Sequence, residues 1–206
     1  MNIDDGAAMR AIPHGILFAG NPSRAAASAV ADACVSHDAD GIWAAQAVAA
    51  AIAVAIADGT TEEIVHTARS MLPLGSWIAH AMDIAMSICE RAQNIEDAYE
   101  DLHIKLWTPE HATAAEAIPQ VFAIFKLCNG EPHHSLLWSA NFGRDADTIS
   151  GLVCSFSGAM HGDTAFPNEW IERLRKPSGT CLEFAMEEDI VQLAKDLVAL
   201  SCSLEE

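Results

Sequence analysis

The sequence predicts an all-α protein, and three observations lead to that class. Of the 206 residues, 51% are apolar but only 6% are aromatic. Alanine, the strongest helix former, dominates the apolar fraction. No segment shows the alternation and β-branched enrichment that are typical of strands. We therefore expect one all-α domain over residues 1–206, without a long internal linker.

Caps, prolines and glycines place the helical segments in order along the chain. Pro13 and Gly15 interrupt residues 5–20, which we expect to form a loop that enters a short helix. Pro119 lies inside a later helix and predicts a kink or a restart there. We expect helices over residues 22–35, 41–57, 60–72, 76–91, 94–106, 113–127, 132–140, 149–160, 167–174 and 187–204.

Two of these segments, residues 41–57 and 149–160, are very apolar, so we expect the bundle to be built around them. The first is also the one candidate for a membrane span. It is short for that purpose, is interrupted by Gln46 and consists mostly of alanine, which is barely favourable in lipid. A buried core helix is therefore the better prediction. The N-terminus also lacks the basic and apolar regions of a signal peptide.

Charge and cysteine usage exclude several classes of partner and location. The formal net charge is -18, and a chain this acidic repels phosphate backbones, so we expect no nucleic-acid partner. From the length and composition of residues 41–57 we also expect no membrane. A small phosphate-bearing ligand is compatible with this charge if metal ions neutralise it. The six cysteines are spread along the chain without a C-x-x-C pair, which predicts free thiols and a cytoplasmic protein.

The stretch Asn141–Ser150 is the strongest candidate for a chemical site. Asp145 and Asp147 are two residues apart, Thr148 follows, and an apolar run begins directly after them. Oxygen ligands this close together suit a hard divalent cation such as Mg²⁺. The alternative is helix capping, since aspartate and threonine are common in a first turn. Capping explains one acid and the threonine more easily than both acids, and the two interpretations stay open at this point.

Two further polar clusters lie at predicted helix junctions. The small residues of the stretch 6–10 (GAAMR) let a ligand approach the backbone closely, and the alternative is an ordinary loop with a surface arginine. In the stretch 36–41 (SHDADG), a histidine beside carboxylates could orient a phosphate or a ribose. The alternative there is a solvated loop with a cap residue. A bundle can gather such junctions at one end, where they would form a single site.

Taken together, these clusters resemble the motifs of the ADP-ribosylglycohydrolase family, which includes the dinitrogenase reductase-activating glycohydrolases. Residues 5–15 (DGAAMRAIPHG) are similar to the family's N-G-x-A-M-R-x-x-P-x-G stretch. Ser36-His37, followed by the apolar helix 41–57, matches its Ser/Thr-His element and alanine-rich helix. Residues 143–148 (GRDADT) and 158–162 (GAMHG) match its G-x-D-x-D-T and G-A-x-x-G motifs.

The resemblance covers nearly the whole chain and implies an orthogonal all-α bundle with a binuclear Mg²⁺ centre, in which Mn²⁺ can substitute. It implies hydrolysis of an N- or O-glycosidic bond of an ADP-ribosyl or related ribosyl group. The substrate would be an ADP-ribose-like small molecule or an ADP-ribosylated protein. The implied metal ligands are Asp145, a bridging Asp147 and Thr148. The implied ligand-binding residues are Gly6, Ala7, Met9, Arg10 and His37.

The chain also departs from the family's pattern. The family's G-D-x-x-G and T-D-D-T segments complete the metal shell and, in many members, supply the acid/base carboxylate. Neither segment is present, so no catalytic residue is assigned. Asp5 stands where the family often has Asn, and Arg144 stands where it often has a small residue.

The absent segments lead us to expect the C-terminal two-thirds of such an enzyme. Its activity would then need an N-terminal segment from a partner chain. A partner or a homo-oligomer would also cover the apolar surface that the absent segment leaves exposed. The alternative is a degenerate homologue or partial chain that binds ADP-ribose-like ligands, or has a structural role, without hydrolysis.

Overall fold

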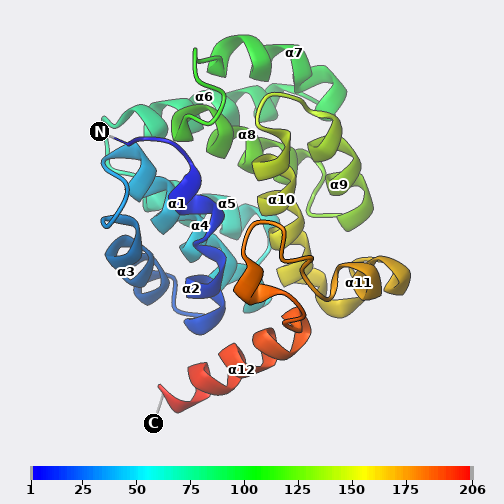
Figure 1. Cartoon of the computed structure of the whole chain (residues 1–206). Helices are drawn as coiled ribbons and strands as arrows, with labels where there is room; N and C mark the ends of the chain where they lie inside the picture. The colour runs from blue at the N-terminus through cyan, green and yellow to red at the C-terminus, as the bar shows by residue number, and fades with distance from the viewer. Residues whose placement is uncertain (1, 205–206) are drawn as a thin grey trace.

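The computed structural model confirms the all-α prediction for residues 2–204, which it describes apart from the side chain at position 163 (Figure 1). Positions 1, 205 and 206 of the predicted domain lie outside the described residues. Within residues 2–204 there is no β-strand, and a single isolated bridge joins Asp4 to Thr113. The α-helices are α1 Gly6–Met9, α2 Ile12–Leu17, α3 Pro22–Ala33, α4 Asp40–Ile56, α5 Thr61–Ser70, α6 Trp77–Arg91, α7 Ile95–Leu106, α8 Ala114–Leu127, α9 Pro132–Asn141, α10 Ala146–His161, α11 Asn168–Leu174 and α12 Ile190–Ser203. Two short 3-10 helices are η1 Gly162–Thr164 and η2 Glu183–Ala185.

Helices α4 and α8 form the centre of the bundle. Of the 17 residues of α4, 12 are buried, and of the 14 residues of α8, 12 are buried. Helices α1, α2, α3 and α5 pack against α4, while α6 and α10 pack against α8. The prediction that residues 149–160 form the second central helix was therefore wrong. Only 6 of the 16 residues of α10 are buried, because its other side lines two surface cavities.

Several helices begin where the capping chemistry of the sequence predicts. At the start of α5, the Thr60 N–H donates to Glu63 Oε2 at 2.8 Å, and the Glu63 N–H donates to Thr60 Oγ1 at 3.3 Å. This reciprocal pair is a capping box. Asn21 and Asn94 cap α3 and α7 by accepting backbone N–H groups at 3.1 Å and 2.9 Å. These starts therefore follow from local sequence alone.

The first twenty residues are more helical than predicted. Pro13 lies in the first turn of α2, where a missing N–H costs no intrahelical hydrogen bond. Gly15 lies inside α2, at a position where α2 contacts α4. A Cβ on residue 15 would lie only 2.5 Å from Ile52 Cβ. Glycine therefore lets α2 approach α4 closely. Pro119 likewise lies within an uninterrupted α8, so no restart occurs there.

Helix α10 begins at Ala146, whereas the apolar pattern predicted a start at Ile149. Asp147 and Thr148 are therefore in the first helical turn, and Asp145 is the N-cap residue. Helix α1 packs against both α4 and α10. The core thus brings the N-terminal GAAMR stretch beside the acidic stretch that precedes α10 (Figure 1).

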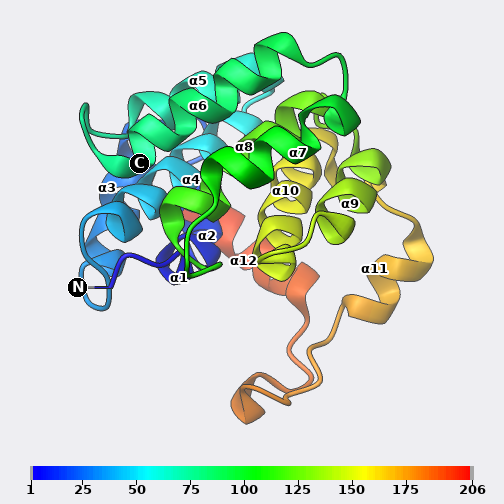
Figure 2. The same ribbon diagram turned by 90° about the horizontal axis from the view of Figure 1, so that it is seen from above.

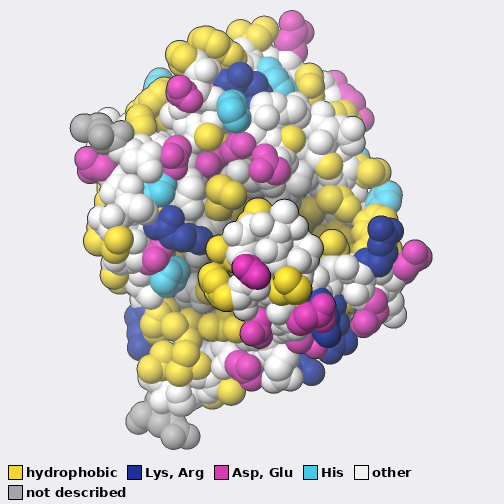
Figure 3. All heavy atoms as spheres, in the orientation of Figure 1, with side chains coloured by type: hydrophobic (Ala, Val, Ile, Leu, Met, Phe, Trp, Pro, Cys, Tyr) yellow, Lys and Arg dark blue, Asp and Glu magenta, His cyan; other side chains and the backbone are white. Residues whose placement is uncertain are grey.

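Helix α11 and the segment between it and α12 project from the bundle (Figure 2). Helix α11 and η2 have no buried residue, and α12 lies against α2. Apolar side chains of α12 are about half exposed, among them Leu193, Val198 and Leu200. Figure 3 shows hydrophobic surface over this helix. None of the helices in the described part of the chain is both long and apolar enough to cross a membrane, and all six cysteines are free, as predicted.

The close approach of α2 and α4 predicts that Gly15→Ala destabilises the protein by about 1–3 kcal/mol, because the added methyl group overpacks the contact with Ile52. Gly158→Ala is the matched control. Nothing lies within 4 Å of a Cβ at that position in α10, so alanine should be neutral or stabilising through its helix propensity. Urea denaturation of both variants measures the difference. Equal effects would contradict the packing role of Gly15.

Candidate metal centre

Two aspartates from distant parts of the sequence meet where α1 and α10 begin. Asp5 is the N-cap residue of α1, and Asp145 is the N-cap residue of α10. Both side chains are buried, with residue exposures of 2% for Asp5 and 7% for Asp145. The two carboxyl groups are close enough to influence each other's protonation. Figure 3 shows acidic side chains gathered near the centre of the face that carries α1 and α10.

Both aspartates stand at an N-cap position, but neither side chain forms the hydrogen bond of a cap. Neither Asp5 nor Asp145 accepts a hydrogen bond from the N–H groups of the helix that follows it. Among the described residues, Oδ2 of each is buried without a hydrogen-bond partner. Burying an unpaired carboxylate oxygen costs free energy, so such atoms need an explanation. Helix capping, which the sequence left open for Asp145, does not provide it.

The two carboxyl groups repel each other when both are charged. Burial, and next the neighbouring Asp145, raise the pKa of Asp5 to about 9. A shared site for two carboxylates has this effect because the second negative charge is unfavourable in a poorly solvated position. Near neutral pH, the metal-free pair is therefore stabilised either by a proton on Asp5 or by a positive charge beside both groups.

These residues fit a divalent cation. The orphaned oxygens of Asp5 and Asp145 are hard ligands that have no other partner among residues 2–204. Within the same residues, no group of three or more acidic, histidine or cysteine side chains is arranged to hold a metal ion. A cation bound here would therefore take its remaining ligands from hydroxyl groups, water or another chain, which suits Mg²⁺ because it commonly keeps several waters.

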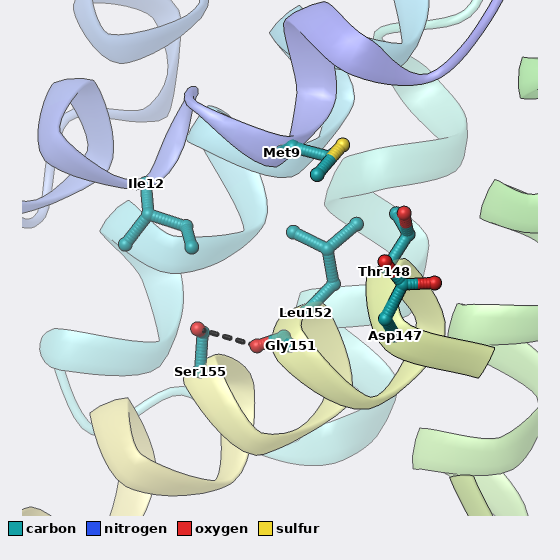
Figure 4. Close-up of a pocket in the computed structure, with 7 residues that line it drawn as sticks. All are labelled: Met9, Ile12, Asp147, Thr148, Gly151, Leu152 and Ser155. Atoms are coloured by element: carbon teal, nitrogen blue, oxygen red, sulfur yellow. Dashed lines mark hydrogen bonds between the residues drawn. The ribbon is translucent and has the colours of Figure 1, made fainter. Parts of the chain in front are cut away.

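A cavity of about 220 Å³ lies beside the first turns of α10. Figure 4 shows Met9 from α1 facing Asp147, Thr148 and Leu152 from α10 across this space. Ser155 closes the lower end and donates its hydroxyl to the Gly151 carbonyl at 2.7 Å. Asp147 is exposed and Thr148 is buried. The cavity therefore has one oxygen-bearing side and one apolar side.

His37 anchors the loop that carries Asp5. Its Nε2 lies 2.6 Å from Asp4 Oδ1, and its Nδ1 lies 2.8 Å from Ser36 Oγ. Arg10 donates to Ser36 Oγ at 2.7 Å. The backbone nitrogen of Ala7 lies 3.1 Å from the same His37 Nε2. A chain of polar contacts from Arg10 to Asp4 thus holds the residue next to Asp5.

Asp4 is stabilised as a carboxylate by this arrangement. Partial burial alone would raise its pKa, but hydrogen bonds from the Gly6 N–H and from His37 lower it. The Gly6 N–H to Asp4 Oδ1 distance is 2.9 Å. A Cβ at Gly6 would lie 3.0 Å from the same oxygen and 3.2 Å from His37 Nε2. Glycine at this position therefore avoids a tight contact with the Asp4–His37 pair, which is a structural reason for its presence whether or not a ligand approaches it.

The predicted ligand-binding residues take different positions around the site. Met9 lines the cavity directly. The side chain of Ala7 is buried, and Arg10 is paired with Asp32 at 2.7 Å. The side chain of His37 is 5% exposed. Contact of Gly6, Ala7, Met9, Arg10 and His37 with a ligand stays a prediction, as does metal binding by Asp145, Asp147 and Thr148.

Sequence reasoning missed Asp5 as a candidate ligand and Asp4 as its anchor. The two adjacent acids ahead of the GAAMR stretch were a usable signal, but they do not form the family's T-D-D-T segment. Their role becomes visible only because α1 packs against α10. Asp5 and Asp145 are far apart in the sequence, so no local pattern of a single sequence predicts that they lie close together.

A comparison with protein families supports the resemblance seen in the motifs. The sequence model of the family described as ADP-ribosylglycohydrolase matches residues 2–205. The chain belongs to the ADP-ribosylglycohydrolase family. Among curated proteins it is similar to the Uncharacterized protein YegU of Escherichia coli (strain K12), with 28% identity over 177 residues. The match covers 79% of this chain and 52% of YegU, so the chain spans about half the length of that relative.

Membership in the ADP-ribosylglycohydrolase family agrees with the all-α fold and with the positions of two motifs. The GAAMR stretch forms α1, and the DADT stretch starts α10. These helices pack together. Motifs that are far apart in this family member therefore meet at one place, as the sequence comparison predicted.

The raised pKa of Asp5 predicts that the metal-free protein becomes less stable as the pH rises. The folded-state pKa lies above the unfolded value, so folding favours the protonated form. Its contribution is complete below about pH 4 and is lost as the pH rises towards about 9. Asp5→Asn cannot ionise, so its stability relative to the wild type should increase by more than about 1 kcal/mol between about pH 5 and about pH 8.

Urea denaturation in EDTA at the two pH values measures this difference. Asp101→Asn is the control, since Asp101 is a surface residue paired with Lys105 on α7. A constant difference between Asp5→Asn and the wild type would show that the Asp5 carboxyl group is not buried beside a second charge.

Proposed function

We propose that this chain belongs to a hydrolase that cleaves an N- or O-glycosidic bond of an ADP-ribosyl or related ribosyl group with bound divalent cations. Mg²⁺ is the proposed cation, with Mn²⁺ as a substitute. The observation that carries this proposal is the pair of buried aspartates whose Oδ2 atoms have no hydrogen-bond partner. Membership in the ADP-ribosylglycohydrolase family supports the class of reaction.

The proposed cation ligands are Asp5, Asp145, Asp147 and Thr148. A bound cation would stabilise the negative charge of the reacting oxygens and lower the pKa of a bound water. Asp5 and Asp145 would supply negative charge at the starts of α1 and α10. Asp147 and Thr148 would present their oxygens to the cavity itself. These four ligands would be divided between two ions, as the family resemblance implies, since no three acidic, histidine or cysteine side chains of residues 2–204 are arranged to hold one ion.

The apolar residues that line the cavity would have a role of their own, which is to exclude water from the site. Met9, Ile12 and Leu152 line the wall opposite or beside the oxygen ligands. An apolar wall excludes water and strengthens electrostatic interactions inside the cavity. A ribosyl group bound there would have its hydroxyls near Asp147 and Thr148 and its carbon atoms against Met9 or Leu152.

The charge of the protein explains why a phosphate-bearing substrate would need the cations. The chain carries a net charge of -18. Arg10, the basic residue of the predicted ligand-binding stretch, already pairs with Asp32. A diphosphate would therefore be neutralised mainly by the metal ions. The proposed partners are an ADP-ribose-like small molecule or an ADP-ribosylated protein, and an N-terminal segment of another chain is the proposed source of the acid/base group.

A second candidate function is binding without hydrolysis. It is favoured by the small number of acidic ligands that residues 2–204 bring together. In that case the site would hold a cation and an ADP-ribose-like ligand but would not turn over a substrate. The two functions share the same residues and differ in the supply of an acid/base group.

The proposed cation site predicts that Mg²⁺ raises the melting temperature of the wild-type protein and that Asp145→Asn removes most of this increase. The substitution keeps the size of the side chain but removes the charge that attracts the cation. Differential scanning calorimetry with and without Mg²⁺ measures the effect. Asp101→Asn, on the surface of α7, should respond to Mg²⁺ as the wild type does. An equal Mg²⁺ response in Asp145→Asn would contradict the assignment.

Hydrolysis and binding alone are separated by incubating the full chain, supplied with a family N-terminal segment that carries T-D-D-T, with an ADP-ribosylated peptide and Mg²⁺, and by calorimetric titration of the same mixture with ADP-ribose. Release of ADP-ribose that depends on Asp147 supports the hydrolase. Binding of ADP-ribose with no release supports the second candidate function. If ADP-ribose is neither released nor bound, both candidate functions are wrong for this chain.

A further inference from the structure

The backbone directly before Asp145 is held in an unfavourable conformation. Gly143 has a φ angle of 89° and Arg144 a φ angle of 56°. Glycine adopts a positive φ readily, whereas a long side chain such as arginine does so rarely. A non-glycine residue keeps this conformation only where its surroundings hold it in place. The contacts of Arg144 must therefore hold the backbone in the conformation that precedes Asp145.

Arg144 forms a buried ion pair with Glu116 of α8. Its Nε and Nη2 donate to the two carboxylate oxygens of Glu116, with an Nη2–Oε2 distance of 2.9 Å. Nη2 also donates to the Thr108 carbonyl at 2.6 Å. The Glu116 side chain is 1% exposed. A bidentate pair of this kind fixes orientation as well as distance, so Arg144 is attached to the central helix of the bundle.

Glu116 has no free capacity for a cation, in contrast to Asp5 and Asp145. Besides Arg144, it accepts hydrogen bonds from the backbone N–H and the hydroxyl of Thr108, both at 2.7 Å. Its charge is therefore compensated within the fold. The guanidinium of Arg144 also lies 5.8 Å from the centre of the Trp107 ring, which covers it. These contacts have a structural function and leave the neighbouring Asp145 unpaired.

A second attachment holds the other side of the same turn. Tyr99 and His103 of α7 both contact the carbonyl oxygen of Phe142, at 3.2 Å and 2.9 Å. The His103 and Phe142 rings lie 4.3 Å apart. The turn between α9 and α10 is thus attached to α7 through Phe142 and to α8 through Arg144. Asp145 follows as the first residue beyond both attachments.

Such attachment is needed because the two carboxylates do not attract each other. Without a cation, one of the two carboxyl groups must either keep a proton or remain as a second buried charge, and a turn that moves one of them into water would avoid that cost. Contacts elsewhere must oppose that movement if the pair is to be ready for a cation. We propose that Arg144, through its ion pair with Glu116, is a positioning residue that holds the Asp145 carboxylate beside Asp5. This inference rests on the proposed cation site.

The test removes the ion pair without leaving a buried charge or a strained backbone. The double variant Arg144→Gly/Glu116→Gln replaces the left-handed arginine with glycine and neutralises its buried partner. The matched control is Arg69→Ala/Asp83→Asn. It breaks another bidentate pair, with distances of 2.6 Å and 2.8 Å, between α5 and α6. None of its residues belongs to the proposed site.

The first measurement needs no metal. In EDTA near neutral pH, Asp5→Asn should raise the melting temperature of the wild type and of the control, because it removes the cost of burying a second carboxyl group beside Asp145. In the Arg144→Gly/Glu116→Gln background this gain should fall by at least half, since Asp145 can move away. An undiminished gain in that background, or no gain in the wild type, overturns the proposal.

The second measurement is Mn²⁺ binding to the full chain, followed by electron paramagnetic resonance. Residues that orient metal ligands typically change affinity about 10-fold or more. The Arg144→Gly/Glu116→Gln variant should show such a loss, and the control should bind as the wild type does. Unchanged affinity overturns the positioning role. If the wild type binds no Mn²⁺, the proposed function fails, while the measurement in EDTA still decides whether Arg144 holds Asp145.

A milder variant covers the case in which the double variant does not fold. Arg144→Lys keeps the positive charge beside Glu116 but cannot make the bidentate pair. It should fold and show an intermediate loss of both the Asp5→Asn gain and the Mn²⁺ affinity. A purely structural role predicts lower stability of Arg144→Lys with both of these quantities unchanged, and that result overturns the proposal.

Discussion

The unfavourable burial of the Asp5 and Asp145 carboxyl groups side by side is the constraint on which the arrangement around the site depends. Two buried carboxyl groups without hydrogen-bond partners are unfavourable by themselves. The chain keeps them together through contacts that lie just outside the pair. Asp4 and His37 hold one side, and Arg144 holds the other. A protein that only needed stable helix starts would have used these aspartates as caps.

The alanine-rich core makes this convergence possible. Helix α4 is buried along most of its length, and its small side chains allow neighbouring helices to approach closely. Gly15 shows the same effect in α2, where a single Cβ would collide with Ile52. Close packing of short helices brings α1 to the start of α10. The composition that predicts the fold class is thus also the physical reason why the two polar stretches meet.

The relation to the ADP-ribosylglycohydrolase family gives these observations a chemical direction. The family model matches residues 2–205, and YegU shares sequence with the chain over about half of its own length. The two buried carboxyl groups with unpaired Oδ2 atoms support the proposed binding of cations. The same cations would allow a phosphate-bearing ligand to approach a surface that otherwise repels it. Acidity, buried carboxylates and the proposed substrate class therefore belong to one explanation.

The sequence by itself determined the all-α class, most helix boundaries and the family, because alanine content, capping residues and motifs are local properties. It also identified Asp145, Asp147 and Thr148 as candidates. It left open whether Asp145 caps a helix, and only the tertiary structure decided that it does not. The partnership of Asp145 with Asp5 and the attachment of Arg144 to Glu116 were likewise decided by packing. These contacts join residues far apart in the chain, and no local pattern encodes them.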